Sequence, residues 1–232
     1  MFKRRQALGF IGGTVVVSLV GCLRGQSASV EPTPSCVVKP QQTEGPYFVD
    51  EKLNRKDIRS DPSDGSVKPG VPLRLVFRVS GVDGRSCTPL RGAMVDIWHC
   101  DALGVYSDVT DPRFSTVGKK FLRGYQVTDT NGTAEFVTIY PGWYEGRTVH
   151  IHFKIRTDSA SGRGYEFTSQ LYFDDSLTDQ IHAQRPYAAK GQRTLNNSRD
   201  GIFRGGGEQL ILQLTKDAQG YVGTFDIGLS QA

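Results

Sequence analysis

One five-residue segment restricts the fold of this chain more than any other, because its side chains alternate in character. Val149, Ile151 and Phe153 are apolar, and His150 and His152 stand between them. Side chains two positions apart on a β-strand point to the same face of a sheet. The alternation therefore predicts a strand that places three apolar groups in a core. The two imidazoles would lie on the opposite face, roughly 7 Å apart at the backbone.

The two histidines of this segment are candidate metal ligands. Imidazoles at this spacing can both reach one ion at the roughly 2 Å length of a metal–imidazole bond. An ordinary half-exposed polar face is the alternative explanation. However, the chain has only four histidines, and two of them follow directly on a turn that carries Trp143, Tyr144 and Arg147. A phenol, a guanidinium and two imidazoles so close together favour a metal site.

The phenol of Tyr144 narrows the choice of metal. Imidazole suits zinc, copper, iron and nickel. A tyrosine has a pKa near 10, so it binds a metal at neutral pH only where a strong cation removes its proton. Ferric iron does this more readily than zinc or ferrous iron, and two tyrosines with two histidines would hold Fe(III) firmly. The best candidate for the second tyrosine is Tyr106, which lies in a glycine-containing loop after a short predicted strand.

The rest of the chain reads as short strands separated by turn signals, with one helical pattern at residues 176–183. This spacing indicates an all-β fold, a β-sandwich of about eight short strands with long loops around the metal site. Residues 196–207 are polar and rich in glycine, and they are predicted to form a long loop near a rim. The expected strands are residues 73–79, 94–98, 121–127, 133–139, 149–156, 165–173, 209–214 and 221–227.

Residues 1–22 are typical of an export signal. Lys3-Arg4-Arg5 precedes an uncharged apolar run that is barely long enough to span a bilayer. The arginine pair is compatible with twin-arginine export. Residues 19–22 resemble a lipoprotein cleavage box, so a lipidated Cys22 would attach the mature protein to a membrane; cleavage without a lipid is the alternative. We expect an exported protein, periplasmic or on the outer surface, with residues 23–40 as a flexible tether.

Export predicts an oxidising compartment, in which cysteines pair. If Cys22 carries a lipid, Cys36, Cys87 and Cys100 remain. We favour a Cys36–Cys87 disulfide that holds the N-terminal arm to the sheet, and the sequence leaves the pairing open. Cys100 directly follows an apolar strand and is expected to be buried and free. The net charge of +4 comes partly from the leader, and no basic tract with interleaved aromatics follows it, so no nucleic-acid partner is expected.

A set of motifs between residues 43 and 173 resembles the intradiol ring-cleavage dioxygenases, the family of catechol and protocatechuate 3,4-dioxygenases. The motifs occur in family order, and together they are highly specific. The gap from Tyr144 to Arg147 is shorter than in the well-known cytoplasmic enzymes, which resembles the compact, exported branch. The matching segments are Thr43-Glu44-Gly45-Pro46-Tyr47, Gly92-Ala93-Met94-Val95-Asp96-Ile97-Trp98, Gly104-Val105-Tyr106, Arg123-Gly124-Tyr125, Asp129-Thr130-Asn131-Gly132, Pro141-Gly142-Trp143-Tyr144, Arg147-Thr148-Val149-His150-Ile151-His152 and Gln170-Leu171-Tyr172-Phe173.

The resemblance implies a catalytic domain at residues 41–232 with a β-sandwich core. It also implies a mononuclear non-haem Fe(III), with no nicotinamide, flavin or haem. The reaction would open the ring of a catechol-type diol with O2 and place both oxygen atoms in a cis,cis-muconate-type diacid. The implied ligands are Tyr106, Tyr144, His150 and His152.

The resemblance also implies three catalytic residues. Tyr144 would leave the metal and accept a proton from the substrate. Arg147 would stabilise negative charge that develops on the substrate ring. Gln170 would line the site, where it could bond the substrate; a strand residue that bonds a neighbouring loop is the alternative. The segment Thr43–Tyr47 would pack over the mouth of the pocket.

Two other classes of function compete with this one. A zinc hydrolase could use His150 and His152, but it would need a third histidine or carboxylate and a general base. A non-catalytic exported sandwich that binds a ligand is compatible with the leader. Such a binding domain has no use for a redox ion, so the Tyr/His/Arg set argues against it.

Overall fold

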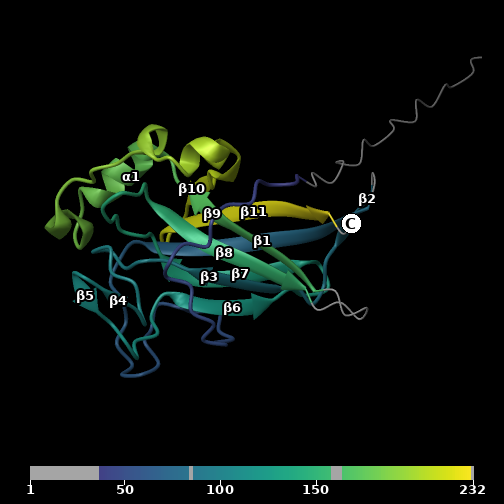
Figure 1. The fold of residues 1–232 in the computed structure, drawn as a ribbon, viewed down its shortest axis with the longest axis horizontal. Helices are drawn as coiled ribbons and strands as arrows, with labels where there is room; N and C mark the ends of the chain where they lie inside the picture. The colour runs from purple at the N-terminus through teal and green to yellow at the C-terminus, as the bar shows by residue number, and fades with distance from the viewer. Residues whose placement is uncertain (1–36, 84–85, 158–163, 231–232) are drawn as a thin grey trace, which may run out of the picture. The chain divides into compact units, whose positions relative to one another are not determined.

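The computed structural model describes residues 37–83, 86–157 and 164–230, which form two main β-sheets (Figure 1). In the first sheet, β1 (Pro72–Asp83) pairs with β11 (Tyr221–Ser230), β2 (Ser86–Pro89) and β7 (Thr133–Ile139), and β10 (Leu214–Lys216) pairs with β11. The second sheet has the order β6 (Arg123–Val127), β3 (Met94–Trp98), β8 (His150–Thr157) and β9 (Tyr165–Tyr172). A small hairpin joins β4 (Thr110–Asp111) to β5 (Phe114–Ser115).

Alternating apolar side chains hold the two sheets together. In β1, Leu73, Leu75, Phe77 and Val79 are buried while their neighbours are more exposed. The Phe77 ring lies 5.3 Å from the ring of Phe153 on β8, which belongs to the other sheet. Burial of large side chains at such contacts is the main source of stability in a sandwich. The predicted all-β sandwich is confirmed.

The histidine-bearing strand β8 lies inside its sheet, between β3 and β9 (Figure 1). In the register of these antiparallel pairs, His152 is opposite Trp98 on one side and Gln170 on the other. His150 is opposite Tyr172. Residues opposite each other share a face of the sheet. The strand pairing therefore places Trp98, Gln170 and Tyr172 beside the two imidazoles.

Seven of the eight expected strands are present, and the expected helix is α1 (Asp175–His182). The Asp174 side chain caps this helix by accepting a hydrogen bond from Leu177 N. The strand expected at residues 209–214 is wrong. A 3₁₀ helix, η4 (Gly207–Leu210), occupies its first part, and β10 begins only at its last residue. The alternating leucines suggested a strand, but Gly206 adopts the left-handed conformation and starts a tight turn.

The segment expected to be a plain loop, residues 196–207, folds into short helices that pack on the core. It contains η2 (Asn197–Arg199) and η3 (Phe203–Gly205), and η1 (Tyr187–Lys190) precedes it. Asn197, Asp200 and Phe203 are buried. The polar composition of this segment conceals buried side chains that make specific hydrogen bonds.

One cysteine prediction is confirmed, and the predicted disulfide lies partly outside the described residues. Cys100 is free and buried, as expected. Cys87 is disulfide-bonded, and its expected partner Cys36 lies outside the described residues. The leader expected at residues 1–22 and most of the expected tether also lie outside them. Residues 37–40 belong to the folded part, because Val37 O accepts a hydrogen bond from Gly228 N of β11.

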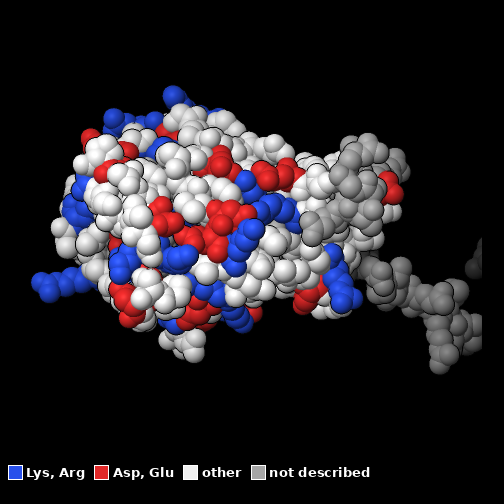
Figure 2. Space-filling model, turned by 60° about the horizontal axis from the view of Figure 1, so that its bottom comes forward, with Lys and Arg blue, Asp and Glu red and all other residues white. Residues whose placement is uncertain are grey.

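Charged side chains of both signs are interspersed on the face shown in Figure 2. Many charged side chains of the described residues form ion pairs, such as Lys119 with Asp64 at 2.7 Å and Lys56 with Glu135 at 2.9 Å. No helix within the three described ranges is long and apolar enough to cross a membrane.

Candidate metal centre

The imidazoles of His150 and His152 point toward each other from the start of β8. Their Nε2 atoms lie 3.0 Å apart, and both side chains are buried. His150 Nδ1 donates a hydrogen bond to Thr148 O at 2.7 Å, so the lone pair of the neutral ring is on Nε2. Burial lowers the pKa of both histidines well below the usual range, and the charge of Arg147 lowers it further. Both rings are therefore neutral, the form that binds metals.

The phenol of Tyr144 joins the two imidazoles. Its hydroxyl lies 3.2 Å from His150 Nε2. The turn that carries it packs closely on the preceding loop, because a Cβ at Gly142 would lie 2.4 Å from Ala102 O. Burial raises the pKa of Tyr144, and the nearby charge of Arg147 opposes this effect. The hydroxyl therefore keeps its proton unless a strong cation removes it.

The phenol of Tyr106 lies close to Tyr144 and His152 and is only 1% exposed. Its ring centroid lies 5.7 Å from that of Tyr144 and 6.4 Å from that of His152. Its hydroxyl is buried and makes no hydrogen bond with the described residues. A buried hydroxyl without a partner costs free energy. Tyr106 Oη is therefore available as a ligand for a metal ion, because no described residue forms a hydrogen bond with it.

The two imidazoles are spaced as ligands of a single metal ion. Two nitrogens 3.0 Å apart have the separation of neighbouring ligands that form bonds of about 2.1 Å to one ion. Within the described ranges, no third His, Cys, Asp or Glu joins the histidines to form a ligand group. His99 and His182 instead bond to Thr138 and to Pro141 O. Further donors must come from the phenols, which prefer a hard, highly charged cation.

The guanidinium of Arg147 lies beside this group and is held firmly. Its Nε donates to Asp200 Oδ2 at 2.8 Å, and one terminal nitrogen donates to Gln170 Oε1 at 2.6 Å. The other terminal nitrogen, Nη1, has no hydrogen-bond partner among the described residues. This contact is not an exposed surface ion pair, because the Arg147 side chain is 15% exposed and the Asp200 side chain 1%. Arg147 is a fixed cation with one free donor group.

Asp200 is the site residue that the sequence analysis missed. Its carboxylate accepts hydrogen bonds from Arg147 and from the backbone N–H groups of Thr148, Ile202 and Phe203. Burial alone would raise its pKa, but these bonds outweigh burial and hold the pKa below the usual value. One signal was present in the sequence: Asp200 is the only acidic residue between residues 196 and 207.

Gln170 connects Arg147 to the segment Thr43–Tyr47. Its Oε1 accepts from Arg147 and from Tyr172 Oη, and its Nε2 donates to Thr43 O at 2.9 Å. The amide is thus occupied by protein groups on both sides. This geometry is that of a residue that positions Arg147, and it matches the alternative of a strand residue bonded to a neighbouring loop.

The segment Thr43–Tyr47 packs against two of the candidate ligands. Gly45 has a φ of +73°, and a Cβ at this position would lie 3.1 Å from His152 Cε1. Tyr47 stacks on Tyr106 with ring centroids 4.5 Å apart, and its hydroxyl donates to Asp111 Oδ2 at 2.7 Å. The arm therefore restricts one imidazole and one phenol.

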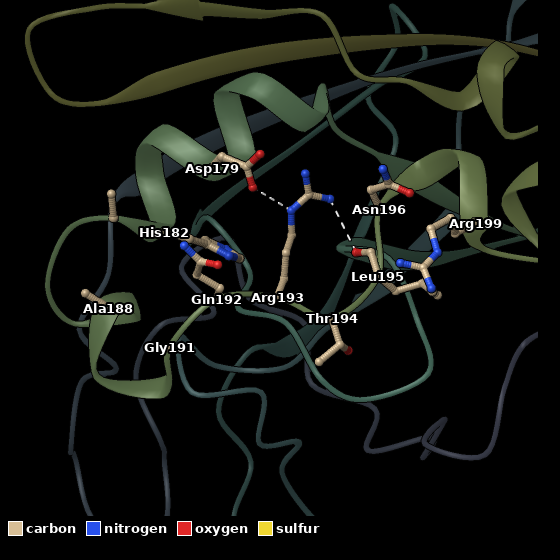
Figure 3. A pocket seen from close by; sticks show the side chains of 11 residues that line it. Asp179, His182, Ala188, Gly191, Gln192, Arg193, Thr194, Leu195, Asn196 and Arg199 are labelled. Atoms are coloured by element: carbon tan, nitrogen blue, oxygen red, sulfur yellow. Dashed lines mark hydrogen bonds and ion pairs between the residues drawn. The ribbon is translucent and has the colours of Figure 1, made fainter.

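A separate cavity of about 580 Å³ lies between α1 and the segment that follows η1 (Figure 3). None of the four candidate ligands lines it. Arg193 crosses it and donates to Asp179 Oδ1 at 2.7 Å and to Leu195 O at 3.3 Å. Its wall supports the turn of Tyr144, since Trp143 Nε1 donates to Gly191 O at 3.1 Å.

Known proteins are similar to this chain over much of its length. A family model described as Dioxygenase matches residues 43–218. The chain is 28% identical over 165 residues to catechol 1,2-dioxygenase 1 of Acinetobacter lwoffii, covering 59% of this chain and 49% of that protein. It is 32% identical over 142 residues to the protocatechuate 3,4-dioxygenase beta chain of Burkholderia cepacia, covering 56% of this chain and 59% of that protein. The chain thus spans about half the length of these curated relatives.

Two solved structures are similar over most of the chain. The intradiol ring-cleavage dioxygenase from Tetranychus urticae has a TM-score of 0.71 and 32% identity, covering 84% of this chain and 95% of that one. The dioxygenase domain of a carbohydrate-binding fusion from Streptomyces sp. SirexAA-E has a TM-score of 0.58 and 32% identity, covering 84% of this chain and 100% of that one. Together with the family match, these similarities show that the chain belongs to the intradiol ring-cleavage dioxygenase family.

Proposed function

We propose that this protein is a non-haem Fe(III) intradiol dioxygenase. It opens the ring of a catechol-type substrate with O2 between the two hydroxyl-bearing carbons and yields a cis,cis-muconate-type diacid. One arrangement of side chains carries most of the proposal. His150 Nε2 lies 3.0 Å from His152 Nε2 and 3.2 Å from the hydroxyl of Tyr144, and the buried hydroxyl of Tyr106 nearby has no hydrogen-bond partner among the described residues. Tyr106, Tyr144, His150 and His152 would hold the ion.

When bound, the ferric ion would supply the positive charge that favours the deprotonated phenols and the deprotonated diol and that prepares the ring for O2. The protein must still accept the protons that a diol releases. Tyr106 is fully buried, whereas Tyr144 is partly exposed. Tyr144 is therefore the more accessible of the two phenols, and we assign its Oη as one proton acceptor.

Arg147 contributes a fixed charge to the reaction. Its Nε and one terminal nitrogen are held by Asp200 and Gln170, which leaves Nη1 free to face a ligand. A preorganised cation stabilises negative charge that develops on a substrate ring without reorganising during the reaction. In this account Gln170 and Asp200 act through Arg147 and are positioning residues.

The other two classes of function are less well supported. A zinc hydrolase needs a third nitrogen, sulfur or carboxylate ligand, and no such group accompanies His150 and His152 in the described part of the chain. A ligand-binding sandwich does not account for the buried, unpartnered hydroxyl of Tyr106.

A ring-cleavage assay tests the proposed function. Purified protein that contains about one iron per chain should consume one O2 per catechol and form a diacid. In ¹⁸O2, both oxygen atoms of the label should appear in the product. Mass spectrometry of the product provides the measurement. Cleavage outside the two hydroxyl-bearing carbons, or no O2 consumption by iron-loaded protein with any simple catechol, would contradict the proposal.

Replacing Tyr144 by phenylalanine separates proton transfer from iron binding. Tyr144→Phe keeps the ring and its packing but removes the proton acceptor, so turnover should fall by about 10²–10⁴-fold. Iron should still bind through Tyr106 and the two histidines. Tyr106→Phe is the matched control, and it should chiefly reduce iron content. Steady-state rates compared at equal iron content decide the matter, and a wild-type rate for Tyr144→Phe would refute the assigned role.

Replacing Asp200 by asparagine tests the positioning of Arg147. The change removes the buried counter-charge of Arg147, so kcat/KM for a catechol should fall by roughly 10–100-fold, as is common for groups that orient a site residue. Iron content should not change, because Asp200 contacts no candidate ligand through its side chain. Asp226→Asn, on a partly exposed carboxylate of β11 that pairs with Arg78, is the matched control. Equal kcat/KM for both variants and the wild type would exclude this role.

A further inference from the structure

The two histidines of the candidate metal centre are oriented in different ways. His150 is fixed by the hydrogen bond from its Nδ1 to Thr148 O. His152 Nδ1 is buried and has no hydrogen-bond partner among the described residues. Its ring instead stacks on the indole of Trp98, with centroids 5.0 Å apart and planes 6° from parallel. The plane of His152 therefore depends on whatever fixes the plane of Trp98.

Aromatic rings pack against the Trp98 side chain. Besides His152, Phe48 contacts the indole, with ring centroids 4.8 Å apart and planes 59° from parallel. The indole Nε1 is buried and makes no hydrogen bond with the described residues. Buried indole N–H groups usually find a partner, because leaving one unsatisfied costs free energy. A donor at the edge of the ring is thus left without an acceptor.

A complementary atom is available from the N-terminal arm. Glu51 Oε1 is also buried, no hydrogen-bond donor in the described ranges reaches it, and the carboxyl group of Asp108 lies beside the Glu51 carboxyl. The other oxygen of the same carboxylate pairs with Lys120 Nζ at 2.5 Å, so the carboxylate is held in place. An indole N–H can only donate, and a carboxylate can only accept.

One small cavity connects these two residues. Glu51 and Trp98 both line it, together with Phe48, Leu53 and Arg123. Its volume is about 10 Å³. This matches the room that a single water molecule requires, and a buried water also needs at least two polar partners. The cavity thus has room for one water molecule. The residues that line it include one unsatisfied donor, Trp98 Nε1, and one unsatisfied acceptor, Glu51 Oε1.

We propose that one buried water molecule occupies this cavity, accepts a hydrogen bond from Trp98 Nε1 and donates one to Glu51 Oε1. The bridge fixes the indole plane, and the indole in turn fixes the plane of His152. Trp98 and Glu51 are therefore positioning residues for the candidate ligand. The effect on His152 as a ligand rests on the proposed function, whereas the water site itself does not.

A crystal structure of the wild-type protein at about 1.5 Å resolution tests the water directly. We expect one well-ordered density peak within hydrogen-bond distance of both Trp98 Nε1 and Glu51 Oε1. A cavity without density, or a direct hydrogen bond between these two atoms, would overturn the proposal. This result does not depend on whether the protein contains iron.

Replacing Trp98 by phenylalanine tests the consequence for His152. Trp98→Phe keeps an aromatic ring beside His152 but removes the N–H, so the water should be lost. Iron release to a chelator should become roughly tenfold faster, and the electron paramagnetic resonance signal of the ferric ion should change shape. Tyr165→Phe is the matched control, because Tyr165 pairs with Thr157 five positions along β9 from Gln170 and does not line this cavity. It should leave the water, the release rate and the signal unchanged.

Glu51→Met repeats the test from the acceptor side and serves if Trp98→Phe does not fold. It has a similar length but no acceptor, and it should give the same loss of water and the same change of signal. Wild-type signals and release rates in both variants, with the water absent, would show that the water does not position His152. Protein that binds no iron would instead contradict the proposed function and leave the density to decide the water site.

Discussion

The site depends on the burial of two neutral imidazoles whose Nε2 atoms lie 3.0 Å apart on one interior strand. Burial lowers the pKa of both histidines, so neither imidazole becomes protonated and forms an ion pair with a carboxylate. The residues around β8 must then be able to lie beside the nitrogen lone pairs of the two neutral rings. Trp98 and Gln170 fill the positions opposite His152, and Tyr144 approaches His150 from the turn before the strand.

The local parts of this site could be predicted from the sequence. The alternation of residues 149–153 has a single structural solution, because a period of two belongs to a strand. The turn before it and Tyr144 lie within ten residues of the strand, so their proximity needs no knowledge of the fold. Cys100 was correctly expected to be buried and free, since it continues the apolar run of β3.

The parts that come from distant segments could not be predicted. Asp200 reaches Arg147 across 53 positions of sequence, from a segment whose glycines and polar residues are typical of a loop. The role of the Gln170 amide depends on Thr43 O, a backbone atom that has no signature in sequence. The expected strand at residues 209–214 failed because the buried Leu210 and Leu212 alternate as they would in a strand, although Leu210 lies in a 3₁₀ helix and Leu212 lies before β10 begins. In each case the structure depends on contacts between distant segments, which the local sequence pattern does not determine.

The central claim is that both phenols and both imidazoles bind one ferric ion that also receives the substrate. A visible absorption spectrum of the purified protein, recorded before and after adding catechol without oxygen, tests it most directly. Tyrosinate bound to Fe(III) absorbs visible light strongly, and a diol that displaces Tyr144 should shift this absorption to longer wavelength. Protein that is colourless and carries one zinc per chain, or an iron band that catechol leaves unchanged, would contradict the account.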